Sequence, residues 1–99
     1  MTNILNKSGI LYWTVENVQA APSKPGVYVL RSATDIASII FIGSSENLDQ
    51  RLKELILSSE ISGVSFFDWY ETQNVEKAVH IERKWVQQYA PKLNMNNIS

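Results

Sequence analysis

Two runs of β-branched and aromatic residues constrain the fold most strongly. The first is GVYVLR, from Gly26 to Arg31, and the second is SIIFIG, from Ser38 to Gly43. Residues of these types favour strands, and only the short segment SATDIA separates the two runs. The runs are therefore predicted to pair as an antiparallel hairpin with a slightly long loop.

Three further elements follow the hairpin. Asn47 begins a predicted helix, because its side chain can cap the backbone while Gln50 reaches back, as in a capping box. The run VSFFDWYET, residues 64–72, alternates in the manner of a third strand. Asn74 caps a last long helix, which Pro91 ends. The sequence thus predicts an α+β fold with a small three-stranded antiparallel sheet flanked by helices.

One charged residue interrupts the apolar face of the last helix. At about 100° per residue, Glu82 lies about 20° from Val75 and Tyr89 and about 40° from Ala78 and Val86. An ionised carboxylate among apolar neighbours needs a cation, a metal ion or hydrogen-bond donors, or else it takes up a proton. The pattern alone leaves open a structural ion pair, a carboxylate that reaches solvent past small neighbours, and a functional site.

The composition limits what such a site can bind. The 99 residues contain no cysteine and one histidine, which excludes thiolate zinc sites and histidine-rich metal sites. Any metal ion must be held by oxygen ligands, which points to Mg²⁺ or Mn²⁺. The formal net charge of −1 argues against broad non-specific binding of nucleic acid, although it leaves room for a local basic patch.

The chain is expected to be one cytoplasmic domain over residues 1–99. It has no stretch near the roughly 18 consecutive apolar residues of a membrane span, and its N-terminus lacks the pattern of a signal peptide. Residues 25–94 form the predicted core. Residues 1–24 form an N-terminal extension in which Thr14 caps a short helix that ends at Ala20. No heptad pattern or interface stripe indicates an oligomeric state.

Several short motifs occur together in the order of a known family. They are the tripeptides Gly26-Val27-Tyr28 and Phe41-Ile42-Gly43, then Arg51, then Ala78 with Glu82 one turn later, and the closing Pro91 and Asn94. From about Pro25 to Asn94 the chain resembles the GIY-YIG nuclease domain, which occurs in excision-repair nucleases, homing endonucleases and small bacterial proteins. Each motif alone is weak, but the set, combined with a compatible order of strands and helices, is specific for the fold.

The resemblance implies a divalent-metal-dependent endonuclease that hydrolyses DNA phosphodiester bonds. Glu82 would hold one Mg²⁺ or Mn²⁺, and Arg51 would clamp the scissile phosphate. Tyr28 would orient or activate the attacking water, which a phenol can do only if nearby cations lower its pKa. Asn94 would brace the site through hydrogen bonds. Nucleic-acid contacts are expected from four basic residues: Arg51, Lys53, Arg83 and Lys84.

Three departures from the family pattern support a second hypothesis. Phe41 replaces the usual tyrosine of the second tripeptide, so one hydroxyl group of the site is missing. The segment Ser44-Ser45-Glu46 follows where many members have a basic residue, and Leu55 stands where several have histidine or tyrosine. The alternative function is therefore a catalytically degenerate module that binds nucleic acid or a protein partner. For the endonuclease, DNA is the expected partner, and a protein partner could supply the specificity.

Overall fold

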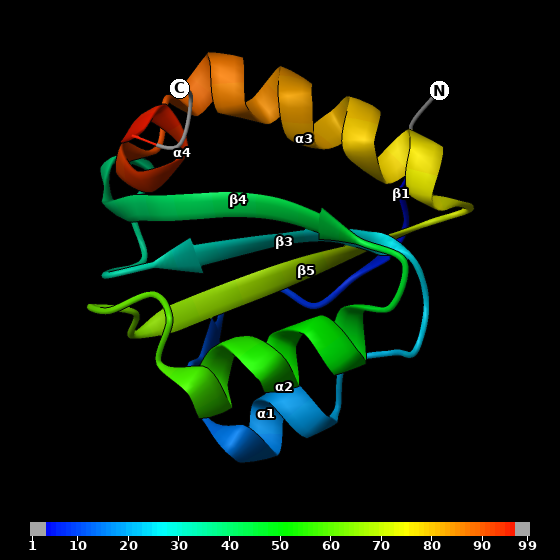
Figure 1. Ribbon diagram of the computed structural model, residues 1–99, viewed down its shortest axis with the longest axis horizontal. Helices are drawn as coiled ribbons and strands as arrows, with labels where there is room; N and C mark the ends of the chain where they lie inside the picture. The colour runs from blue at the N-terminus through cyan, green and yellow to red at the C-terminus, as the bar shows by residue number, and fades with distance from the viewer. Residues whose placement is uncertain (1–3, 97–99) are drawn as a thin grey trace.

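The computed structural model describes residues 4–96, with side chains through residue 94. One antiparallel sheet lies between two layers of helices, with α1 and α2 on one face and α3 and α4 on the other (Figure 1). The elements in chain order are β1 (Ile4–Lys7), β2 (Leu11–Tyr12), α1 (Val15–Gln19), β3 (Gly26–Arg31), the 3-10 helix η1 (Ile36–Ser38), β4 (Ile39–Ser45), α2 (Leu48–Ser58), β5 (Phe66–Thr72), α3 (Val75–Tyr89) and α4 (Lys92–Asn96).

The three predicted strands form the centre of the sheet. β3 pairs antiparallel with β4 and with β5, and the register aligns Tyr28 with Gly43 on one side and with Trp69 on the other. The predicted fold class and hairpin are therefore confirmed. Two short strands that the sequence did not predict enlarge the three-stranded sheet to five, because β1 and β2 both pair with the outer side of β5.

The two long helices begin at the predicted caps. The side chain of Asn47 accepts a hydrogen bond from the backbone N–H of Gln50 at 3.1 Å, and that of Asn74 accepts from Lys77 at 2.9 Å. α3 ends at Tyr89, two residues before Pro91. None of the helices within residues 4–96 is long and apolar enough to cross a membrane.

Successive residues of β3 point to opposite faces of the sheet and supply two separate cores. Tyr28 and Leu30 lie in the α2-side core, whereas Val27 and Val29 lie in the α3-side core. The buried members of the α2-side core are Val18, Ala21, Tyr28, Leu30, Leu48, Leu52, Leu55, Phe67 and Trp69. Those of the α3-side core are Val27, Val29, Ile39, Ile42, Ala78 and Ile81.

The described part of the N-terminal extension contributes to the same fold. Thr14 caps α1 as expected, and Val18 of this helix is completely buried in the α2-side core. The ring of Trp13 contacts Phe67 of β5 edge to face, with 5.2 Å between the ring centroids. Residues 4–25 therefore supply two strands and several core side chains.

Candidate active site

Tyr28 and Gly43 form the floor of the candidate site. The register of the hairpin brings them opposite each other, and the Tyr28 ring lies across the glycine. A Cβ atom at residue 43 would overlap the hydroxyl and ring atoms of Tyr28, so any side chain there would displace the phenol. Tyr28 is 2% exposed, and its hydroxyl is directed toward the edge strand β4. The glycine of the second tripeptide is thus required by the tyrosine of the first.

Arg51 reaches the Tyr28 hydroxyl from α2. Its guanidinium is near enough to this hydroxyl to interact with it electrostatically, and one third of the side chain is exposed. Two carboxylates contact the same guanidinium, Glu54 at 3.3 Å and Glu60 at 3.7 Å. Arg51 also lines an open depression of about 240 Å³ together with Glu46 and Glu54. The predicted phosphate clamp is therefore accessible, but acidic groups surround it.

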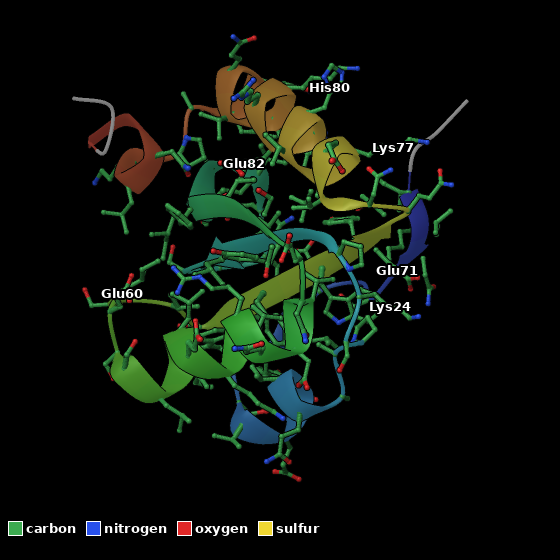
Figure 2. The ribbon with its side chains drawn as sticks, turned by 45° about the vertical axis from the view of Figure 1, so that its right-hand side comes forward. Lys24, Glu60, Glu71, Lys77, His80 and Glu82 are labelled. Carbon is green, nitrogen blue, oxygen red and sulfur yellow. The ribbon has the colours of Figure 1, made fainter. Side chains whose placement is uncertain are left out.

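Glu82 approaches from the opposite side of β4. On α3 the buried side chains are Ala78 and Ile81, and Glu82 is half-buried at the border of that face. Figure 2 shows its carboxylate between α3 and the sheet, whereas His80 points outward. The Ser44 hydroxyl donates a hydrogen bond to Glu82 Oε1, and within residues 4–94 no lysine or arginine forms a salt bridge with Glu82. Of the interpretations left open, the structural ion pair is thereby excluded for the described residues.

The charged groups and the burial around Tyr28 act in opposite directions on the pKa of its phenol. Burial raises the pKa of the phenol above its ordinary value of about 10, and the charges of Glu82 and Glu60 raise it further, while Arg51 opposes them. The protein's own groups therefore do not lower the pKa of Tyr28, because the single partly exposed guanidinium of Arg51 is outweighed. Tyr28 is a neutral phenol near neutral pH and can orient a water molecule by hydrogen bonding.

Asn94 lies behind the floor of the site. Its side-chain amide accepts a hydrogen bond from the backbone N–H of Ile42 at 2.7 Å and donates one to the backbone carbonyl of the same residue at 2.8 Å. Asn94 is 8% exposed. It therefore pairs with the edge strand as a neighbouring strand would, and holds the residue before Gly43 in position.

The departures from the family pattern have different structural consequences. Phe41 lies on the same side of β4 as Gly43, and its ring is tilted against that of Tyr28 with 6.2 Å between the centroids. Leu55 is buried in the α2-side core, where it packs and contributes nothing to the site surface. Phe41 thus removes a hydroxyl beside Tyr28, whereas Leu55 is explained by packing.

The other predicted nucleic-acid contacts lie away from this cluster. Lys53 forms an ion pair with Asp49 one turn earlier at 3.3 Å, on a different side of α2 from Arg51. Arg83 and Lys84 are exposed on α3, and by helical rotation Arg83 is nearer than Lys84 to the border occupied by Glu82. Among the four basic residues, the fold brings only Arg51 against Tyr28.

The donor set is compatible with a hard divalent cation. Within the described residues no group of three or more His, Cys, Asp or Glu side chains could hold a metal ion. Glu82 is a half-buried carboxylate without a cationic partner there, and Ser44 adds a hydroxyl oxygen beside it. Mg²⁺ keeps several water ligands and needs only one or two carboxylates together with substrate phosphates, so these residues fit it.

Comparison with known proteins assigns the family. The model of the T5orf172 domain matches residues 26–97, most of the chain. The chain belongs to the T5orf172 domain family. The N-terminal boundary of the match coincides with the start of β3, so β1, β2 and α1 lie outside it.

Curated relatives of this T5orf172 domain include UvrABC system protein C. The protein from Aquifex aeolicus is 36% identical over 90 residues, which cover 82% of this chain and 15% of the relative. The protein from Mycoplasma genitalium is 28% identical over 90 residues, covering 81% of this chain and 14% of the relative. The T5orf172 domain therefore spans a small part of the length of these relatives.

The fold is that of the GIY-YIG nuclease domain. The N-terminal endonuclease domain of UvrC from Thermotoga maritima, solved with its catalytic magnesium ion, superposes with a TM-score of 0.68 at 23% identity, covering 78% of this chain and 90% of that one. A tyrosine-to-phenylalanine mutant of that domain, also bound to its catalytic divalent cation, gives a TM-score of 0.67 at 24% identity, with the same coverage. The resemblance inferred from the motifs is thus confirmed at the level of the fold.

Some contacts near the T5orf172 site escaped the sequence analysis, which noted Ser44 only as a departure from the family pattern and did not single out Glu60. Ser44 contacts Glu82, and Glu60 contacts Arg51. Tertiary packing alone creates these contacts, so no local pattern indicates them. A polar network under α3 was also missed. Arg31 forms two hydrogen bonds with the buried carboxylate of Asp68, which also accepts one from Tyr70. The sequence did contain a signal for this network, because Arg31 and Asp68 carry opposite charges within two otherwise apolar strand runs.

Proposed function

We propose that this T5orf172 domain is an endonuclease that hydrolyses DNA phosphodiester bonds with one divalent cation, Mg²⁺ or Mn²⁺. The observation that carries the proposal is that Arg51 of α2 and Glu82 of α3 both act electrostatically on Tyr28 of β3, whose ring lies across Gly43. These residues are a neutral phenol, a permanent cation and a carboxylate without a cationic partner in the described residues. Phosphodiester hydrolysis needs charge stabilisation on the phosphoryl oxygens and a positioned water molecule, which these groups can supply together with a cation.

Each side chain has a role that its surroundings support. Arg51 binds the phosphate, because its planar guanidinium can donate to two phosphoryl oxygens at once. Tyr28 orients the attacking water through its hydroxyl, on which the charge of Arg51 acts. Asn94 is a positioning residue that keeps Ile42, and with it the adjacent Gly43, in the strand.

Glu82 is the proposed metal ligand. Its half-buried carboxylate has a hydroxyl partner and retains lone pairs for a cation. When bound, the cation polarises the phosphate and stabilises the charge that develops on the leaving oxygen. The magnesium described for the UvrC domain of Thermotoga maritima supports the choice of Mg²⁺.

The test is cleavage of supercoiled plasmid and branched DNA in Mg²⁺ or Mn²⁺. Glu82→Gln removes the charge of the proposed ligand and is expected to abolish cleavage. Glu76→Gln is the matched control, because Glu76 is exposed in the first turn of the same helix and should cut like the unmodified protein. Undiminished cleavage by Glu82→Gln would contradict the metal assignment.

Two observations favour a second candidate, a catalytically degenerate module that binds nucleic acid or a protein partner. Phe41 removes a hydroxyl group beside Tyr28, and carboxylates surround Arg51. In this case the protein cuts no tested DNA, and Glu82→Gln does not change its binding of Mn²⁺. Phe41→Tyr separates the candidates further, because an endonuclease should keep or gain activity when the hydroxyl is restored.

A further inference from the structure

Ser44 makes a contact that neither the motifs nor the proposed roles use. It follows Gly43 in β4, and its register partner is Val27, a member of the α3-side core. From this side of the sheet its hydroxyl donates to Glu82 Oε1. The packing of α3 against β4 alone brings together two residues that are 38 positions apart.

The chemistry of this contact differs from that of an ion pair. A serine hydroxyl has one proton, and donating it to Oε1 occupies one of about four acceptor positions of the carboxylate. The donor is neutral, so Glu82 keeps its full negative charge for a cation. The hydrogen bond also restrains a flexible side chain, whose ordering would otherwise reduce the affinity for a metal ion.

The geometry supports a role for the contact in the site. Both residues are half-buried, so solvent competes less for the hydrogen bond than it would on an open surface. The carboxylate is also near enough to Tyr28 for its charge to act on the phenol, which links the contact to the proposed site.

We propose that Ser44 is a positioning residue that orients the Glu82 carboxylate for binding a divalent cation. This inference rests on the proposed function, because it assigns a second residue to the same metal site. A hydrogen bond of this kind, from a residue that does not itself bind the metal, typically changes metal affinity by about 10–100-fold when it is removed.

The test measures binding of Mn²⁺ alone, by calorimetry and by the electron paramagnetic resonance of the free ion. Ser44→Thr and Ser44→Val form the decisive pair, because their side chains have nearly the same shape and differ in the hydroxyl group. Ser44→Ala removes the hydroxyl without adding volume. Ser38→Ala is the matched control, because the hydroxyl of Ser38, in η1, also donates a hydrogen bond to a carboxylate, that of Asp35. Cooperative unfolding of each metal-free variant verifies that it is folded.

We expect the dissociation constant for Mn²⁺ to rise about tenfold in the valine and alanine variants, and the threonine variant to keep most of the affinity. Ser38→Ala should bind like the unmodified protein, and Glu82→Gln should not bind. Unchanged affinity of Ser44→Val, with binding still dependent on Glu82, would overturn the role of Ser44 alone. Binding that Glu82→Gln leaves intact, or no binding by the unmodified protein, would overturn the metal site and this inference together.

Discussion

Replacing Asn94 by alanine should destabilise the protein severely, although the residue is close to the end of the chain. The substitution removes both side-chain hydrogen bonds to Ile42 and leaves a buried N–H and a buried carbonyl without their partner. An unsatisfied buried polar group costs about 1–3 kcal/mol. Because β4 is an edge strand and water reaches part of it, we expect a total loss of about 2–4 kcal/mol. That is a large fraction of the roughly 5–15 kcal/mol by which domains are stable.

Urea denaturation followed by tryptophan fluorescence measures this loss. The midpoint should fall with little change in the slope, because the surface exposed on unfolding is nearly the same. Gln87→Ala is the control, since Gln87 is exposed on α3. A change for Asn94→Ala within the ~0.5 kcal/mol typical of surface positions would refute the account of Asn94 as a partner of the edge strand.

Three other predictions concern the groups around Tyr28. Gly43→Ala should destabilise the fold by about 1–3 kcal/mol through overpacking and displace the phenol, measured by denaturation and by loss of any DNA cleavage. Glu60→Gln removes a carboxylate 3.7 Å from Arg51 and should tighten DNA binding about 2–5-fold at low salt, measured by fluorescence anisotropy; a gain that persists at high salt would argue against the electrostatic cause. Burial raises the phenol pKa values of Tyr28 and Tyr70, so these groups lose their protons at a lower pH in the unfolded chain than in the folded one. The free energy of unfolding should therefore fall as pH rises above about 10, and Tyr70→Phe should make this fall less steep in denaturation measured at several pH values.

The elements that the sequence predicted are those with a local signal. Helix caps at Asn47 and Asn74 and the apolar runs of β3, β4 and β5 can be recognised from neighbouring residues alone. β1 and β2 carry no such signal, because they are four and two residues long and β1 is mostly exposed. They become strands by pairing with β5, and a bulge interrupts even that register. Such pairing depends on residues some 60 positions away.

The residues of the site could be predicted where a charged side chain interrupts an apolar face. Glu82 was found because a carboxylate on an apolar helix face needs an explanation, and the hydroxyl of Ser44 supplies part of it. The effect of the protein's own groups on the pKa of Tyr28 could not be predicted, since the degree of burial that raises it is a property of the assembled fold. Arg31 and Asp68 had the same kind of signal as Glu82 and could have been paired on that ground.

The folded domain includes an N-terminal segment, residues 4–25, that lies outside the family match. The family match begins at residue 26, but β5 has its outer backbone groups paired with β1 and β2, and Val18 fills the α2-side core. A fragment cut at the match boundary would leave β5 as an open edge beside exposed aromatic residues, a combination that favours association between copies. Expression of this domain alone, or its transplantation into another protein, should therefore carry residues 4–25 along.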